Sequence, residues 1–173
     1  MRGLRSGFRE RGGRVSDLGF RRGRRGEALA LEFLMRRGWR ILDRNWRDGP
    51  RELDAVARRE GVLAFVEVKT RSWRSGPPRG SRHGPGPAPG ARDHALASAT
   101  TSVTWRKRRE VHRAARAWVA HSQTLPEEVR IRMFGRPWPS VLRFDLIVVL
   151  FSNHDDPEVI HVPDAWRPGW PNG

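Results

Sequence analysis

A glutamate and a lysine lie two residues apart in the strongest strand signal of the chain, VLAFVEVKT at residues 62–70. The apolar run predicts a strand, on which Glu67 and Lys69 share one face with Phe65. Burying either charge in such surroundings is costly without a partner. Two arrangements meet this requirement: a mutual ion pair, or a metal ion held by Glu67 with Lys69 beside it, facing a substrate.

A second carboxylate, Asp54, lies in the preceding segment, ELDAVAR at residues 52–58. The short connection between the two segments predicts an antiparallel hairpin, which places Asp54 and Glu67 on neighbouring strands. The simpler interpretation of Asp54 is a residue of a turn or of the hairpin end. The interpretation that links it to Glu67 depends on where the hairpin closes.

Two converging carboxylates repel each other unless one is protonated or a cation bridges them. Mg²⁺ prefers oxygen ligands, with waters completing an octahedron. Such an ion polarises a phosphate and lowers the pKa of a bound water. Lys69 would orient that water or neutralise the charge that develops on the phosphate. The pattern therefore predicts a Mg²⁺ or Mn²⁺ site at Asp54 and Glu67.

Lysine is rare in this chain, which has 34 basic residues of which only Lys69 and Lys107 are lysines. A lysine is a compact point charge, whereas arginine is a planar fork that stays protonated. Lys107 lies one turn before Val111 on the inward face of a predicted helix. It is therefore either a contact to phosphate or to the active site, or a charge on the helix surface.

Five short motifs follow one another along the chain: Gly26-Glu27, Arg51-Glu52-Leu53-Asp54, Phe65-Val66-Glu67-Val68-Lys69-Thr70-Arg71, Lys107, and Arg143-Phe144-Asp145. This series resembles the YraN family of predicted endonucleases, which belongs to the PD-(D/E)XK superfamily and is similar in fold to archaeal Holliday-junction resolvases. The resemblance implies that Asp54 and Glu67 bind metal and that Lys69 is catalytic. It also implies that Glu27 completes the acidic set as a catalytic residue and metal ligand. An acid in the first turn of a helix also complements the helix dipole, which is the alternative role of Glu27.

The sequence departs from this family at three places. Arg51 stands where the family usually has glycine, a Gly/Pro-rich insertion follows Arg71, and the N-terminal arm is extra. None of these removes a proposed catalytic residue. Arg143 and Asp145 share a strand face and are interpreted as a structural charge pair.

The formal net charge of +15 and the pI of about 11.8 favour a polyanionic partner, nucleic acid before membrane. An arginine-rich codon usage is the simpler explanation of this excess. Residues 1–26 carry a net charge of +7, so nearly half of the excess lies at the N-terminus. The residues expected to contact nucleic acid are Lys107, Arg71, Arg106, Arg108 and Arg109.

The elements that must position these residues are two helices and six short segments. Helices are expected at 24–37 and 104–121, and strands at 39–46, 52–58, 62–70, 128–134 and 142–151, with an edge strand at 159–162. The fold class is α/β, a restriction-endonuclease-like mixed sheet flanked by helices in the order αβββαββ. Residues 1–21 are expected to form a disordered basic arm and 22–166 a single domain. Within that domain a flexible insertion is expected at about 73–100, and 167–173 is expected to be a disordered tail.

The sequence thus predicts a divalent-metal-dependent endonuclease acting on DNA, branched or single-stranded. The alternatives are a nucleic-acid-binding protein that does not cut and an RNA-processing nuclease. The absence of cysteine excludes disulfides, thiolate zinc sites and cysteine nucleophiles. A cytoplasmic location without a membrane span is expected, and a homodimer is expected only by analogy with the resolvases.

Overall fold

The computed structural model describes residues 13–73, 90–135, 139–152 and 156–167, with side chains from residue 18 onward. Four helices and five strands follow one another along these residues. In chain order they are α1 (Gly13–Arg36), β1 (Arg40–Asp48), β2 (Arg51–Arg59), β3 (Val62–Ser72), α2 (Ala91–Thr101), α3 (Trp105–Gln123), α4 (Glu127–Phe134), β4 (Val141–Phe151) and β5 (Glu158–Trp166). The expected α/β class is confirmed.

The five strands form one mixed sheet in the order β1-β2-β3-β4-β5. All neighbouring pairs are antiparallel except β3 and β4, which are parallel. A parallel pair needs a long crossover connection, and the stretch that contains α2, α3 and α4 supplies it. The expected antiparallel hairpin of β2 and β3 is confirmed.

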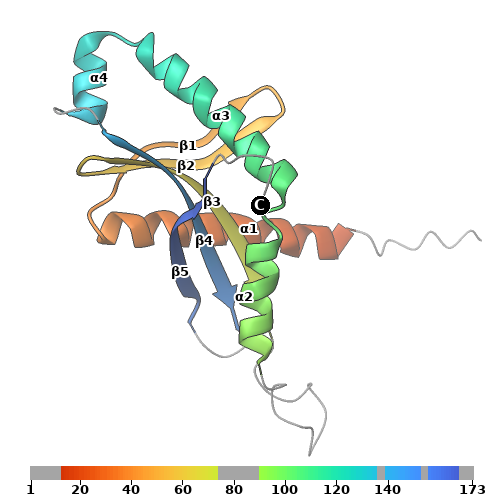
Figure 1. Ribbon diagram of the computed structural model, residues 1–173. Coiled ribbons are helices and arrows are strands. Elements are labelled where there is room, and N and C mark those ends of the chain that lie inside the picture. Colours follow the sequence, from red (N-terminus) through yellow and green to blue (C-terminus); the bar gives the residue numbers. More distant parts are fainter. Residues whose placement is uncertain (1–12, 74–89, 136–138, 153–155, 168–173) are drawn as a thin grey trace, which may run out of the picture.

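The sheet has α1 on one face and α2 and α3 on the other (Figure 1), and it separates two apolar clusters. On one face, α1 buries Ala30 and Leu34 against the strands. On the other face, α2 and α3 cover the strands, and Trp118 of α3 packs edge-on against Phe65 of β3. Because β3 and β4 are covered on both faces, residues 62–66 of β3 and 146–151 of β4 are apolar at every position.

The pairing between strands β2 and β3 stops before either strand ends. Their paired residues run from Arg59 opposite Val62 to Ala55 opposite Val66. Beyond that point β3 stays paired with β4 as far as Ser72, while β2 stays paired with β1. The sheet therefore contains a fork that opens just after Ala55 and Val66, next to the predicted site residues.

The first helix begins earlier than the arm predicted at residues 1–21 allows. Helix α1 starts at Gly13, so residues 13–21 are helical. Arginine is a good helix former, and extending an existing helix adds one hydrogen bond for each residue fixed. Residues 1–12 and 168–173 lie outside the described part of the chain.

Two further expectations are corrected by the helices between β3 and β4. The strand expected at 128–134 is wrong, since these residues form α4, with Pro126 at its N-cap and two glutamates in its first turn, where they complement the helix dipole. The insertion expected at about 73–100 includes α2 at residues 91–101, which buries Ala95 and Ala99 against the sheet. Residues 74–89 of that insertion lie outside the described residues.

None of the helices in the described ranges combines the length and the apolar character that a membrane crossing needs.

Candidate active site

Asp54 lies in the fork between β2 and β3. Its Oδ2 accepts a hydrogen bond of 2.7 Å from the backbone N–H of Val68. The two strands no longer pair at this level, so the carboxylate takes the place that a backbone carbonyl would have in a continuous ladder. The contact fixes the orientation of Asp54, and among the described residues its Oδ1 has no hydrogen-bond partner.

Glu67 is the centre of a charged group made of Glu67, Lys69 and Lys107. Its side chain is 2% exposed, and Lys69 Nζ donates to its Oε1 at 2.6 Å. Lys107, from the first turn of α3, lies on the other side, with Nζ 3.2 Å from Oε2. This second contact has the distance of an ion pair without the alignment of a hydrogen bond, so Oε2 is buried with an acceptor position unfilled. Both lysines of the chain therefore contact the same carboxylate.

Helix α3 brings Lys107 to this point through the pattern predicted from sequence. Thr104 caps the helix, and its side chain accepts a hydrogen bond from the Lys107 backbone N–H. Val111 and Trp118 on the same helix face are buried against the sheet. The inward direction expected for Lys107 is what the structure has.

The pKa values of Asp54 and Lys107 are shifted from their usual values. Burial and the nearby Glu67 raise the pKa of Asp54 from 3.8 to about 7, although the Val68 N–H and both lysines oppose the shift. Burial alone would lower the pKa of Lys107, but the carboxylates of Glu67 and Asp54 outweigh it and raise that pKa. At neutral pH the site therefore holds a protonated Lys107 beside an Asp54 that keeps its proton to a higher pH than an ordinary aspartate.

Glu27 occupies the α1 side of the fork. Burial raises the pKa of its carboxyl, followed by the effect of Glu52, whereas Arg24 lowers it and Glu67 raises it. The residue before it, Gly26, sets how closely α1 approaches β3. A Cβ at Gly26 would lie 2.1 Å from Thr70 Oγ1, so only glycine permits this approach. Gly26 is a positioning residue that the sequence analysis treated only as part of a motif.

The oxygen atoms available fit one kind of metal better than others. Within the described ranges no three His, Cys, Asp or Glu side chains gather closely enough to hold an ion together, so Glu27 does not complete a three-residue set as the side chains stand. Mg²⁺ is usually bound by only one or two carboxylates, and it keeps several waters. A free oxygen on Asp54 and the unfilled acceptor on Glu67 Oε2 match that requirement.

The arginines expected to bind nucleic acid are in varied positions. Arg106 pairs with Glu110 at 3.0 Å on the exposed side of α3, and Arg109 lies over the ring of the exposed Trp105 at 4.5 Å. Arg108 donates to the Val103 carbonyl. In the described part of the chain none of these three contacts the group around Glu67, unlike Lys107.

Arg71 continues β3 beyond Lys69. It donates to the carbonyl of Thr70 at 2.9 Å, so its guanidinium is held close to the strand that carries Glu67 and Lys69.

Arg143 and Asp145 form a separate buried network on the α1 side of the sheet. Asp145 is completely buried, and Arg143 binds both of its oxygens at 2.7 and 2.9 Å. His161 and the backbone N–H of Asp164 contact the same carboxylate. Burial would raise the pKa of Asp145, but these hydrogen bonds outweigh it and lower the pKa. The sequence analysis missed His161, whose only signal was a polar residue in an otherwise apolar edge strand.

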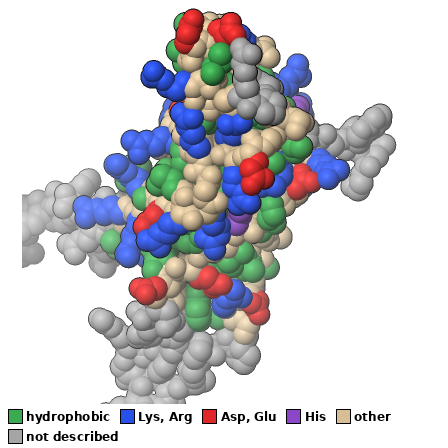
Figure 2. Space-filling model, turned by 90° about the vertical axis from the view of Figure 1, so that its left-hand side faces the viewer, with side chains coloured by type: hydrophobic (Ala, Val, Ile, Leu, Met, Phe, Trp, Pro, Cys, Tyr) green, Lys and Arg blue, Asp and Glu red, His purple; other side chains and the backbone are tan. Residues whose placement is uncertain are grey.

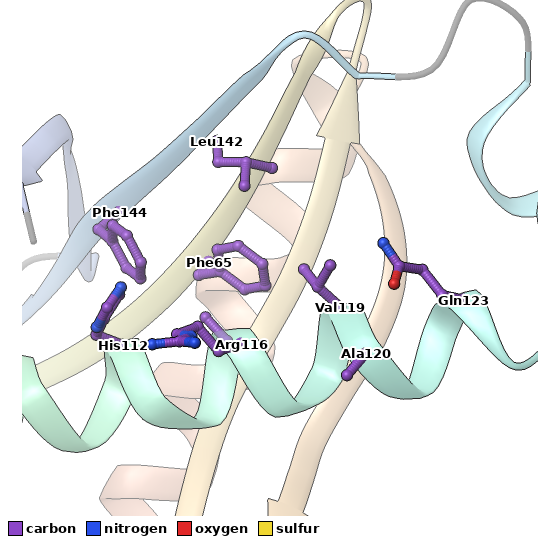
Figure 3. Close-up of a pocket in the computed structure, with 9 residues that line it drawn as sticks. Phe65, His112, Arg116, Val119, Ala120, Gln123, Leu142 and Phe144 are labelled. Carbon is purple, nitrogen blue, oxygen red and sulfur yellow. The ribbon is translucent and has the colours of Figure 1, made fainter.

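An apolar pocket of about 340 Å³ lies between α3 and the sheet, on the face that carries Glu67. Figure 3 shows Phe65 and Phe144 on the strands, opposite Val119 of α3. Burial, followed by Arg116, lowers the pKa of His112 at its rim. The residues that line the pocket include no carboxylate and no lysine. The acid–lysine chemistry therefore belongs to the fork and not to this pocket.

Comparison with known proteins places the chain in a family. Residues 26–149 match the family described as "Uncharacterised protein family UPF0102". A UPF0102 protein of Trichlorobacter lovleyi is 32% identical over 142 residues, which cover 82% of this chain and 86% of that protein. A UPF0102 protein of Rhodococcus jostii is 33% identical over 144 residues, covering 83% and 94%. Another, from Nitratidesulfovibrio vulgaris, is 35% identical over 127 residues, covering 73% and 70%. The matched region contains the fork, both lysines and the Arg143–Asp145 pair, and the chain belongs to the UPF0102 family, the YraN family that its motifs resemble.

Proposed function

We propose that this protein is a divalent-metal-dependent nuclease that hydrolyses phosphodiester bonds in DNA. One observation carries the proposal: the two lysines of a chain that otherwise uses arginine meet at one buried carboxylate, beside a second carboxylate with a pKa of about 7. Perturbed groups of this kind gather at catalytic sites more often than elsewhere. A purely structural ion pair would need neither the second carboxylate nor the second lysine.

Asp54 and Glu67 would hold a Mg²⁺ ion through the oxygens that face the fork. When bound, such an ion polarises a phosphate and makes a bound water more acidic. Asp54 must give up its proton to bind, and the Val68 N–H keeps its carboxylate aimed while it does so. The positive charge of the ion would favour the deprotonated carboxylate and so offset the cost of removing this proton.

Lys69 is the residue placed to touch the substrate. Its side chain is 22% exposed, whereas that of its partner Glu67 is 2% exposed, so the ammonium lies between the buried acid and solvent. There it can donate a hydrogen bond to a phosphate oxygen as negative charge develops. Lysine suits this role because its charge is compact.

Lys107 acts as a positioning residue in this proposal. It contacts Glu67 Oε2 from α3, opposite the contact that Lys69 makes with Oε1. Its ammonium group lies beside the buried carboxylate and fixes the carboxylate plane. Glu27 stands on the far side of the fork, where a bound cation would relieve its repulsion with Glu52 and Glu67.

The charge of the chain supports a nucleic acid as the substrate. The net charge is +15, and Figure 2 shows Lys and Arg side chains distributed over one face, with acidic side chains among them. When Lys and Arg side chains neutralise phosphates, the nucleic acid releases counterions, and this release supplies binding affinity that does not depend on the base sequence.

A second candidate, a nucleic-acid-binding protein that does not cut, is favoured by one specific observation. Both oxygens of Glu67 already face an ammonium group without any metal. In that case the Lys69–Glu67–Lys107 group is a self-sufficient buried network that stabilises the fold.

Cleavage assays separate the two candidates. The purified protein is incubated with supercoiled plasmid, single-stranded DNA, a branched DNA and RNA, with Mg²⁺ or Mn²⁺ and with EDTA. We expect cleavage of DNA with the metal, and a loss of at least 100-fold in Asp54→Asn and Lys69→Met. Asp93→Asn, an exposed acid of α2, is the matched control. Equal cleavage by the two site variants and the wild type would show that another site, or a contaminant, is responsible.

A further inference from the structure

A second pocket, of about 380 Å³, lies on the other side of the same part of β3. Residues from α1 form one wall and residues from β3 form the other. The lining residues are Gly19, Arg22, Gly23, Glu27, Val68, Thr70, Arg71 and Ser72. In contrast to the apolar pocket in Figure 3, this one has two guanidinium groups, two hydroxyl groups and the carboxylate of Glu27 around it.

The two arginines of this pocket, Arg22 and Arg71, contact neutral acceptors, so their positive charges are not neutralised by these contacts. Arg22 Nη1 donates to Ser72 Oγ at 3.0 Å, and Arg71 Nη1 donates to the Thr70 carbonyl at 2.9 Å. Both acceptors are neutral, and in the part of the chain that is described neither arginine forms an ion pair with a carboxylate. Arginine is the side chain best suited to bind a phosphate through paired hydrogen bonds.

The α1 wall is built from glycines at a helical spacing. Gly19 and Gly23 are one turn apart and lie on the same face of α1. A Cβ at either position would meet no atom within 4 Å, so it would project into open space. Each glycine in a helix interior costs about 1 kcal/mol relative to alanine. This composition keeps open a volume that ordinary helix-forming residues would fill.

The pocket adjoins the proposed catalytic group through Val68. Val68 lies between Glu67 and Lys69 in the strand, its side chain lines the pocket, and its N–H binds Asp54. Strand β2 has separated from β3 at this level, so its backbone does not close the sheet between the two sides. The pocket with Arg22 and Arg71 therefore begins at the residue next to Lys69 in the strand.

We propose that this pocket binds a backbone phosphate of the nucleic acid strand, next to the phosphodiester bond that is cleaved. The inference rests on the proposed function, because it takes its occupant from the substrate of that site. Arg22 and Arg71 hold the phosphate, the hydroxyls of Thr70 and Ser72 complete the donors, and the glycine wall admits the sugar–phosphate backbone. Gly19, Arg22 and Gly23 precede residues 26–149, which match the family.

Binding of a fluorescent single-stranded oligonucleotide, followed by anisotropy without divalent ions at several salt concentrations, tests the proposal. Two variants remove the pocket in different ways: Arg22→Ala with Arg71→Ala deletes its charge, and Gly23→Leu fills it. We expect each to weaken binding about tenfold. The arginine variant should also make the salt slope shallower by about 0.7, the value for one phosphate on a single strand.

Matched controls exclude effects of net charge and of folding. Arg36→Ala with Arg132→Ala removes the same charge from exposed positions outside the pocket, and Ala28→Leu adds the same side chain to an exposed position of α1. Gly23→Leu should raise the melting temperature, since leucine forms helices better than glycine. Pocket variants that bind no more weakly than these controls would overturn the proposal.

Two further outcomes keep this inference distinct from the proposed function. Binding that depends on the pocket, in a protein that cleaves nothing with Mg²⁺ or Mn²⁺, would retain the phosphate site and reject the nuclease. An oligonucleotide with a 5′-phosphate is compared with one lacking it. A preference of fivefold or more for the phosphorylated end, lost in the arginine variant, would assign the pocket to a strand terminus and overturn its placement beside an internal bond.

Discussion

The carboxylate of Asp54 accepts a hydrogen bond from the backbone N–H of Val68 at 2.7 Å, in the fork where two strands of the sheet separate. The Asp54 side chain thus accepts a hydrogen bond from β3 at a level where the β2 backbone no longer pairs with β3. The bond holds Asp54 beside Glu67. Burial of Asp54, followed by the proximity of Glu67, raises the pKa of Asp54 to about 7. The geometry of the fork therefore sets the protonation of the site.

This raised pKa predicts an unusual dependence of stability on pH. The folded-state pKa of Asp54 lies above its usual 3.8, so the stabilisation from its bound proton is fully present below about pH 4 and is lost as the pH rises through about 7. Asp54→Asn removes this proton equilibrium. We expect the difference in free energy of unfolding, variant minus wild type, to increase between pH 5 and pH 8 in urea denaturation without metal. A difference that stays constant over this range would contradict the assigned pKa.

Replacing Lys107 should leave the buried carboxylate of Glu67 with one ammonium partner fewer. In Lys107→Met, Oε2 of Glu67 loses its only ammonium neighbour in the described structure, while Lys69 still holds Oε1. Leaving a buried ion without a partner is costly, and since one partner remains we expect a loss of about 2 kcal/mol in the free energy of unfolding.

Magnesium should offset that loss, because a cation at the fork replaces the missing charge. We expect millimolar Mg²⁺ to raise the melting temperature of Lys107→Met more than that of the wild type. Arg109→Met, which removes a cation from the exposed side of the same helix, serves as the control. An equal effect of Mg²⁺ on all three proteins would place the ion elsewhere.

Gly26→Ala tests the close approach of α1 to β3. Alanine favours a helix over glycine by about 1 kcal/mol, yet its Cβ would lie 2.1 Å from Thr70 Oγ1. We expect the clash to prevail, with a net destabilisation of about 1–3 kcal/mol. Adding Thr70→Ala should recover most of the loss, and a double-mutant cycle measures this coupling. Additive effects of the two substitutions would show that the helix approaches the strand differently.

The Asp145 network predicts a loss of stability without a loss of metal binding. Asp145 is fully buried between Arg143 and His161. In Asp145→Asn the guanidinium of Arg143 loses its buried anion, and we expect about 3–5 kcal/mol of destabilisation. The pKa of Asp145 is lowered, so its contribution is present above pH 4 and is lost as the pH falls through the lowered pKa. Affinity for Mn²⁺ below the melting temperature should match that of the wild type; a tenfold change would tie this network to the active site.

Local sequence patterns predicted much of the sheet and of the charged group. The alternation in residues 62–70 places Glu67 and Lys69 on one face, and the short hairpin places Asp54 on the adjacent strand. The helical stripe that contains Val111 and Trp118 directs Lys107 inward. These predictions hold because each depends on the period of a single element or on one short turn.

The helix α4 shows where such patterns fail. Val129, Ile131 and Met133 alternate with polar residues, which is typical of a strand. In the structure Val129 and Ile131 are 40% and 41% exposed, so their alternation does not reflect burial of one face. Pro126 and Gly135, at the two ends of the helix, are the local signals that agree with the structure.

Contacts between distant segments could not be predicted in the same way. The fork depends on a bond between the Asp54 side chain and the Val68 backbone, and the Asp145 network depends on His161 from another strand. No periodicity encodes either contact. The second pocket includes Gly19 of α1, which lies in the predicted arm of residues 1–21.

Calorimetric titration with Mn²⁺ at pH 8 tests the central claim most directly. If Asp54 and Glu67 share one divalent ion, the wild type and the Asp93→Asn control should bind one ion per chain. Asp54→Asn and Glu67→Gln should each lose at least tenfold in affinity. Binding of equal strength and stoichiometry in all four proteins would contradict the account.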